Sequence, residues 1–335
     1  MRLNAKLSNT ANKSNKECIA VLWRERSTEI MKEPNKKSHS SIETSFRDRI
    51  PYYVMLAPFI IFFVLLVAVP MIASVVLSFF EFDMVSLPVA TGFSNYFRML
   101  FDDEIFVETV KNTLLLAVIT GPAGFLLSFV LAWFLNEFKP IIRTVLSFMF
   151  YCPALIGNAY YIWQVAFSSD SYGYINSMLL SIGMITEPVQ WLKDADYVMP
   201  IIIVVQLWMS MGVSFLANIS GLQNVDGEMY EAGAIDGIRN RWQELWYITL
   251  PSMQHMLLFS AVMQISSAFS ISQLPIALAG YPSVGNKVDT VVSYLADAGT
   301  VRYEMGYASA ISVFLFLIMI IVRIVVGNTI KRVGK

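Results

Sequence analysis

Two carboxylates and a run of small residues stand together in the polar stretch Glu231-Ala232-Gly233-Ala234-Ile235-Asp236-Gly237, within a connector that closes at Ile248-Thr249-Leu250-Pro251. Apolar and aromatic residues recur at helical spacing on both sides of Gly237: Tyr230, Ala234 and Ile235 before it, and Trp242, Leu245, Trp246 and Thr249 after it. Gly237 is placed to end the first helix, because glycine adopts the left-handed conformation without steric cost, and Asp226 can cap its start. The pattern predicts a helix, a turn and a helix, a shape suited to docking against a partner.

Cysteine and histidine, the other residue types that often catalyse reactions or bind metals, are isolated from one another in this sequence. Cys18 and Cys152 lie far apart and offer neither a disulfide framework nor metal-ligand spacing, and His39 and His255 are equally isolated. The sequence contains no G-x-x-x-x-G-K-[ST] motif for nucleotide binding. We therefore expect neither an enzyme nor a metal site.

The composition is that of an integral membrane protein. Hydrophobic residues make up 56% of the 335 residues and charged residues only 15%, whereas soluble domains are about one quarter charged. Apolar runs long enough to cross a bilayer are predicted at 53–80, 112–135, 144–167, 199–216, 252–274 and 306–326. The predicted fold is an all-α membrane protein with six transmembrane helices over 51–326, and with the connector 217–251 as its helix-turn-helix loop.

Lysine and arginine residues predict the orientation. Five of the 24 occupy the first, third and fifth connectors: Arg98, Lys111, Lys193, Lys287 and Arg302. The other 19 lie in the tail 1–50, in the second and fourth connectors, and toward the C-terminal segment 327–335. Because positive charge accumulates on the cytoplasmic side, both termini and the connector 217–251 are predicted to be cytoplasmic. The basic tail lacks the apolar segment of a secretory signal and is expected to be largely disordered.

The stretch that begins at Glu231 resembles the EAA loop of binding-protein-dependent ABC importer permeases, whose pattern is E-A-A-x-x-x-G, about nine residues, then I-x-L-P. Two departures are evident, because Gly233 replaces the second alanine and ten residues separate Gly237 from Ile248. The extra residue is expected near Arg239-Asn240, at the turn. An amphipathic loop of an unrelated polytopic membrane protein is the alternative interpretation.

Three shorter matches resemble permeases of the carbohydrate-uptake type. Gly92-Phe93-Ser94-Asn95-Tyr96 resembles the G-x-x-N-Y that follows their first span, and Gly280-Tyr281-Pro282 stands where they often show G-G-P. The connector with Tyr172-Gly173-Tyr174-Ile175-Asn176 and Trp191 carries a Gly-x-Ile-Asn…Trp run that resembles the outward loop of sugar permeases. These matches favour a sugar or oligosaccharide as the transported solute.

The resemblance implies a permease subunit in a bacterial cell (inner) membrane that has no cofactor of its own. Its implied partners are two ATPase subunits that bind ATP, a second and different permease, an extracellular solute-binding protein and lipid, with no nucleic acid. The implied ATPase-coupling residues are Glu231, Ala232, Gly233, Ala234, Asp236, Gly237, Leu250 and Pro251. For Glu231 and Asp236, solvated loop charges are the alternative interpretation.

Polar residues along the fifth predicted span suggest a substrate path. Gln264, Ser267 and Ser270 are spaced by three and share one helix face, Gln273 extends it, and Tyr160 of the third span could stack on a sugar ring. Hydrogen bonding between helices is the alternative role for such residues.

Two other functions stay open at this stage. The same class of transporter could import glycerol phosphate, polyamines, peptides or amino acids. A secondary carrier or channel would work without ATPases, but proton-coupled carriers keep ionisable residues inside the membrane. None of the six predicted spans has an acidic or basic residue in its central part.

Overall fold

The computed structural model describes residues 46–333. Most of the predicted basic tail therefore lies outside the described residues, and its last five positions belong to the first helix, α2 (Phe46–Phe63). The chain divides into two units that meet between Val67 and Ala68, and each unit is described by itself.

The first predicted span is a helix with a π-helical turn inside it. α2 continues through the turn Val64–Ala68 into α3 (Val69–Leu77), and Pro51–Leu77 is apolar enough to cross a membrane. Pro70 has no backbone N–H and its ring blocks the ordinary helical bond to the carbonyl four residues earlier. A π-turn directly before this proline accommodates that defect.

The second unit is helical apart from one two-residue antiparallel ladder, β1 (Phe80–Glu81) with β2 (Val89–Ala90). Its outer and central helices are α4 (Ser94–Phe97), η2 (Arg98–Asp102), α5 (Glu104–Asn136), α6 (Pro140–Ile156), α7 (Tyr161–Ala166), α8 (Tyr174–Ile182), α9 (Ala195–Met209) and α10 (Val213–Gln223). They are followed by α11 (Gly227–Ile235), α12 (Arg241–Glu244), η3 (Leu245–Thr249), α13 (Leu250–Ser252), α14 (Gln254–Phe269), α15 (Gln273–Ala279), η4 (Val284–Asn286), α16 (Val291–Thr300) and α17 (Met305–Val333).

Within residues 46–333, three helices are long and apolar enough to span a membrane: Pro51–Leu77, Glu104–Asn136 and Met305–Ile330. The pairs α9–α10 and α14–α15 are each bent by 40° and raise the number to five if each pair forms one span. The remaining predicted span, 144–167, corresponds to the shorter apolar helix α6, which ends before Gly157 at φ 71°, and to the separate helix α7.

Several helices differ in their bounds from the predicted spans. The helix that contains the second predicted span begins at Glu104, before 112, because the Asp103 carboxylate accepts the Phe106 amide and caps the helix. The spans predicted at 199–216 and 252–274 are not continuous helices, and the loop predicted at 217–251 starts only after α10 ends at Gln223. The last helix continues past 326 to Val333.

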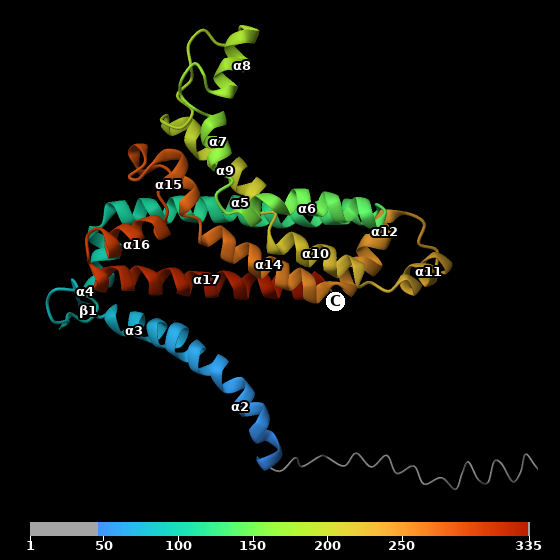
Figure 1. Cartoon of the computed structure of the whole chain (residues 1–335), viewed down its shortest axis with the longest axis horizontal. Helices are drawn as coiled ribbons and strands as arrows, with labels where there is room; N and C mark the ends of the chain where they lie inside the picture. Colours follow the sequence, from blue (N-terminus) through green and yellow to red (C-terminus); the bar gives the residue numbers. More distant parts are fainter. Residues whose placement is uncertain (1–45, 334–335) are drawn as a thin grey trace, which may run out of the picture. The chain divides into compact units, whose positions relative to one another are not determined.

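Helices α5, α10, α14 and α17 form the centre of the second unit, where they run beside one another (Figure 1). α5 packs against α10 and α14, and α14 packs against α17. One apolar cluster surrounds Phe215 between these helices, and another surrounds Phe106, near the start of α5 and against α16 and α17. α5 therefore contacts most of the helices that build the interior.

Two asparagines that stand in the carbohydrate-permease resemblances prove to be structural ties. The Asn95 amide donates to the carbonyls of Ser78 and Phe80, each at 3.0 Å, and closes the end of α3. The Asn176 amide donates to the carbonyls of Ser168, Asp170 and Val189, and its oxygen accepts the Trp191 indole N–H at 2.7 Å. Both motifs hold connectors together within the second unit.

A carboxylate joins the connectors before α5 and around α16 and α17. Tyr294 and Tyr307 both donate to Oδ2 of Asp103, each at 2.5 Å. Burial acts to raise the pKa of Asp103, but the hydrogen bonds from the two tyrosines and from the Phe106 amide outweigh it and hold that pKa below its ordinary value.

We predict that Asp103→Asn destabilises the protein in a pH-dependent way. A depressed folded-state pKa contributes stability above the unfolded-state pKa of about 3.9 and loses it as the pH falls through the folded-state value. At neutral pH the variant should lose about 2 kcal/mol, because hydrogen bonds to a charged acceptor are lost. Thermal unfolding in detergent across pH should show the difference narrowing below about pH 4. The exposed neighbour Asp102 supplies the control Asp102→Asn, and equal effects of the two variants would contradict the prediction.

Candidate functional site

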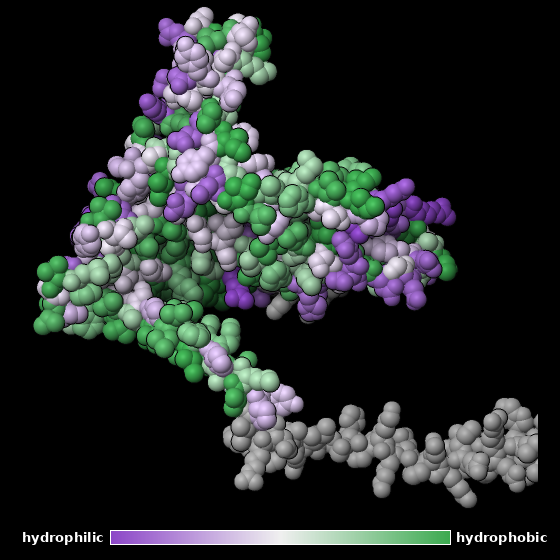
Figure 2. Space-filling model, viewed as in Figure 1, coloured by the Kyte–Doolittle hydropathy of each residue, from purple (hydrophilic) through white to green (hydrophobic). Residues whose placement is uncertain are grey.

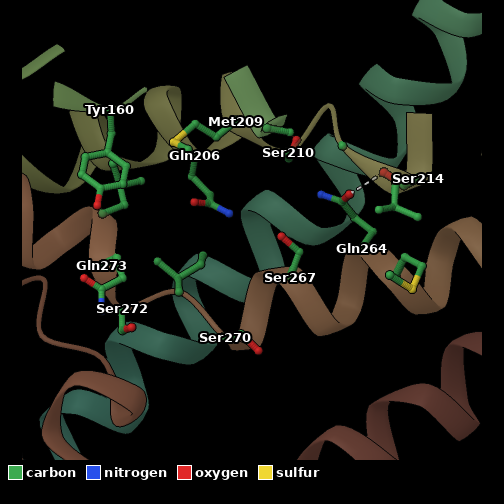
Figure 3. A pocket seen from close by; sticks show the side chains of 16 residues that line it. Tyr160, Gln206, Met209, Ser210, Ser214, Gln264, Ser267, Ser270, Ser272 and Gln273 are labelled. Atoms are coloured by element: carbon green, nitrogen blue, oxygen red, sulfur yellow. Dashed lines mark hydrogen bonds between the residues drawn. The ribbon is translucent and has the colours of Figure 1, made fainter. Parts of the chain in front are cut away.

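The breaks in α9–α10 and α14–α15 meet at one cavity of about 370 Å³ (Figure 3). Ser210 and Gly212 of the first break line it, as do Ser270 and Ser272 of the second. A broken helix leaves backbone groups without intrahelical partners, so breaks at membrane depth are expected only beside a polar cavity or protein.

All five residues of the predicted substrate path lie in the walls of this cavity: Tyr160, Gln264, Ser267, Ser270 and Gln273. Sequence reasoning missed a second polar row that faces them, formed by Gln206, Ser210 and Ser214. The spacing of four within the fourth predicted span would have revealed this row, since residues four apart share a helix face.

Gln264 already uses its amide within the protein. Its Oε1 accepts from the Ser214 hydroxyl at 3.0 Å and its Nε2 donates to the Thr120 carbonyl at 3.4 Å. The side chain is 3% exposed, so hydrogen bonding between helices α5, α10 and α14 is its evident structural role. Within residues 51–330, by contrast, hydrogen bonds are absent for five cavity side chains: Gln206, Ser267, Ser270, Ser272 and Gln273.

The cavity wall is uncharged throughout the described residues. Hydroxyls and amides alternate there with apolar side chains such as Met209, Met263 and Leu274. At the second break, the Thr290 hydroxyl donates to the carbonyl of Ile271 at 2.6 Å and compensates one unpaired carbonyl. The arrangement offers neutral hydrogen-bond donors and acceptors beside apolar surface, which suits a hydroxyl-rich neutral solute.

The predicted helix, turn and helix is present as α11, the turn at Gly237, and α12 with η3. The Asp226 carboxylate accepts the Glu228 amide at 3.0 Å and caps α11. Gly237 has φ 98°, and the Ile238 amide bonds back to the carbonyl of Gly233 at 3.0 Å, which ends α11 in a Schellman motif. Asn240 caps α12, so the departure at Arg239-Asn240 falls in the turn.

Few contacts tie α11 to the rest of the unit, and besides a Ser252 hydroxyl 3.6 Å from Sδ of Met229 they involve Gly233 and Tyr230. A Cβ at Gly233 would lie 2.6 Å from Cδ1 of Ile248, so the bare backbone packs against this side chain. The hydroxyls of Tyr230 and Thr249 are 2.9 Å apart. The predicted coupling residues Glu231, Ala232, Ala234, Asp236 and Gly237 are all exposed, whereas Gly233 is buried and Leu250-Pro251 begins α13.

The exposed side of α11 is mixed in character. Ile235 is 87% exposed between the carboxylates of Glu231 and Asp236. In the space-filling view, hydrophilic residues gather at the end of the unit that carries α11 and α12 (Figure 2). An exposed apolar side chain with polar residues nearby is typical of a protein docking surface.

This loop and the helical architecture define a transporter permease, and the family comparison agrees. Residues 115–335 match the model of the binding-protein-dependent transport system inner membrane component. The chain belongs to this family.

Curated relatives match this chain over most of their own length. The chain is 30% identical over 303 residues to the arabinooligosaccharides transport system permease protein AraP of Halalkalibacterium halodurans, covering 88% of this chain and 92% of that protein. It is 29% identical to the probable ABC transporter permease protein YesP of Bacillus subtilis, covering 84% and 91%. It is also 29% identical to the lactose transport system permease protein LacF of Rhizobium radiobacter, covering 63% and 70%.

A solved structure shares the fold. A chain of a bacterial ABC transporter involved in the import of the acidic polysaccharide alginate superposes with a TM-score of 0.70 at 24% identity, over 86% of this chain and 98% of that one. The protein is therefore a multi-pass inner-membrane permease subunit of a binding-protein-dependent ABC importer, and is not the ATPase of that importer.

We predict that Gly124→Ala disrupts the cavity wall, whereas Gly121→Ala on the same helix does not. A Cβ at Gly124 would lie 2.2 Å from Nε2 of Gln264 and 2.8 Å from Oγ of Ser210, so the Gln264 side chain must move. At Gly121 the nearest atom, Cβ of Ala268, is 3.9 Å away. Thermal unfolding should show a loss of about 1–3 kcal/mol for Gly124→Ala and no loss for Gly121→Ala, since alanine favours the helix. Equal stabilities would argue against this packing.

Proposed function

We propose that the chain imports a neutral sugar or oligosaccharide delivered by an extracellular solute-binding protein. The observation that carries this proposal is the cavity, whose free hydroxyls and amides lie beside apolar side chains without any charged residue among the lining residues. Polyamines, peptides, amino acids and glycerol phosphate are charged and would require a charged counterpart that this wall lacks. Relatives named for arabinooligosaccharides and lactose support the same cargo.

In the proposed mechanism the ATPase subunits supply the energy and the permease subunits supply the path. Two partner ATPases bind ATP, and each binds the coupling helix of one permease subunit, which in this chain is α11. The exposed residues Glu231, Ala232, Ala234 and Asp236 form the contact, and Gly237 supplies the sharp turn that orients it. Closure of the ATPases moves the loops and switches the spans between outward-facing and inward-facing states. A second, different permease encloses the other side of the path.

The proposed topology has six spans within 51–326 and places both termini and the α11–α12 loop in the cytoplasm. The distribution of Lys and Arg along the sequence supports this orientation. α6 with α7, and the two bent helix pairs, complete the six spans together with the three long helices. A secondary carrier is disfavoured by family membership and by the uncharged cavity.

A cysteine at Ala234 should cross-link to a partner ATPase in native membranes. The background is Cys18→Ser with Cys152→Ser, which removes both cysteines of the chain. We expect a cross-link whose yield changes with ATP, because Ala234 is exposed on α11, and none from a control cysteine at Gly92. Labelling of Ala234→Cys from outside the cell would contradict the proposed topology.

Uptake into reconstituted vesicles tests the cargo and the cavity together. We expect import of neutral oligosaccharides, and Ser267→Leu should reduce it about 10-fold or more, because an apolar side chain leaves substrate hydroxyls unpaired. Ser266→Leu is the matched control, since Ser266 is exposed but does not line the cavity. Competition by spermidine or glycerol 3-phosphate, or equal uptake by both variants, would contradict the proposed cargo.

A further inference from the structure

We call α11, the turn at Gly237, and α12 with η3 the docking loop. Its second half, α12 with η3, is attached to the end of α5. The rings of Trp242 in α12 and Trp133 in α5 pack with centroids 5.3 Å apart. Nη2 of Arg241 lies 2.8 Å from Oε2 of Glu137, directly after α5, while its Nη1 lies 2.8 Å from Oε2 of Glu244. The hydrogen bond to Glu244 chiefly raises the pKa of Arg241, so the guanidinium stays charged.

The first half of the loop is attached to the second half. α11 reaches η3 through the Gly233 backbone on Ile248 and through the Tyr230 and Thr249 hydroxyls. η3 continues α12 without a break. A displacement of α11 by a partner is therefore passed to α12, and from α12 to the end of α5.

The same helix forms the back of the cavity wall about three turns nearer its N-terminus. The Thr120 carbonyl accepts from Nε2 of Gln264, and Gly124 lets the backbone of α5 approach this side chain so closely that no Cβ would fit. Gln264 in turn accepts from Ser214 beside the α9–α10 break. One continuous helix thus connects the docking loop to the side chain that ties both broken pairs together.

We propose that α5 is a transmission element between the docking loop and the cavity, acting in addition to α10 and α14, which flank the loop in sequence. Trp133, Glu137, Arg241 and Trp242 are its positioning residues. The proposal rests on the proposed function, because it requires a partner ATPase that moves α11. The ion pair is partly exposed and contributes little by itself. The apolar part of the attachment is the Trp133–Trp242 pair, in which Trp242 is 63% exposed, together with the buried Leu245 of η3 in the same apolar cluster as Trp133.

The test measures motion at the cavity without requiring an identified solute. The complex of this chain with its permease and ATPase partners carries a single reporter cysteine, Ser267→Cys, in the Cys18→Ser and Cys152→Ser background. A maleimide labels the reporter with and without ATP plus vanadate, and the ratio of the two labelling rates reports the ATP-driven change. Co-purified ATPase and its basal hydrolysis are measured on the same samples.

We expect Trp242→Ala with Glu137→Gln to reduce the ratio about threefold while the ATPase still co-purifies. Trp242→Phe, placed in the same Glu137→Gln background, keeps an aromatic partner for Trp133 and should restore the ratio of labelling rates. Phe134→Ala is the matched control, because Phe134 adjoins Trp133 and is about as exposed as Trp242 (61% against 63%) but packs on Phe138 instead of the loop.

An unchanged ratio in the double variant would overturn the role of α5 while leaving the importer intact. A loss that Trp242→Phe does not restore would also overturn it, because it would indicate general damage to the loop. If the parent complex shows no ATP-dependent change, or holds no ATPase, the proposed function itself fails and this inference fails with it. The parent complex therefore tests the proposed function, and the double variant tests the role of α5.

Discussion

The structure depends on one constraint, which is that backbone polar groups inside a membrane must find partners within the protein. Two helix pairs violate helical continuity at the middle of their apolar runs, at Ser210–Gly212 and at Ser270–Ser272. In hydrocarbon such breaks are tolerated only where protein or a polar cavity receives the freed groups. Here both breaks open on the same cavity, and the Thr290 hydroxyl satisfies one freed carbonyl. The cavity and the broken helices therefore require one another.

Polar residues around the cavity have two different roles: some form hydrogen bonds between helices, and others face the cavity. Gln264 and Ser214 bond to each other and hold three helices together, so they fix the shape of the wall. The serines and glutamines without protein partners, such as Gln206 and Ser267, face the space between the broken pairs. The back of the wall is held by hydrogen bonds between helices, and its face keeps free hydrogen-bond donors and acceptors. This arrangement pre-organises a binding site.

Periodicity and composition predicted the helical membrane fold, the docking loop with its Asp226 cap and Gly237 turn, and the polar face from Gln264 to Gln273. These features follow from local rules that a sequence records directly. The helix breaks were not predicted, although the segments 210–212 and 270–272 contain Ser and Gly, because such residues are also tolerated inside helices and the breaks depend on tertiary partners such as Thr290. The start of α5 was missed for a similar reason, since its cap at Asp103 is held by two tyrosines about 190–200 residues away.

The unequal attachment of the docking loop accounts for its unusual glycine. On the proposed function α11 yields to a partner without unfolding, and its Schellman turn and cap satisfy its own ends while few contacts restrain it. Gly233 supplies one of its contacts, since a Cβ there would lie 2.6 Å from Cδ1 of Ile248 and that side chain would have to shift. A larger residue would displace Ile248 or lift α11 away from η3. On the proposed function, the departure from the E-A-A pattern thus lets α11 lie closer to η3.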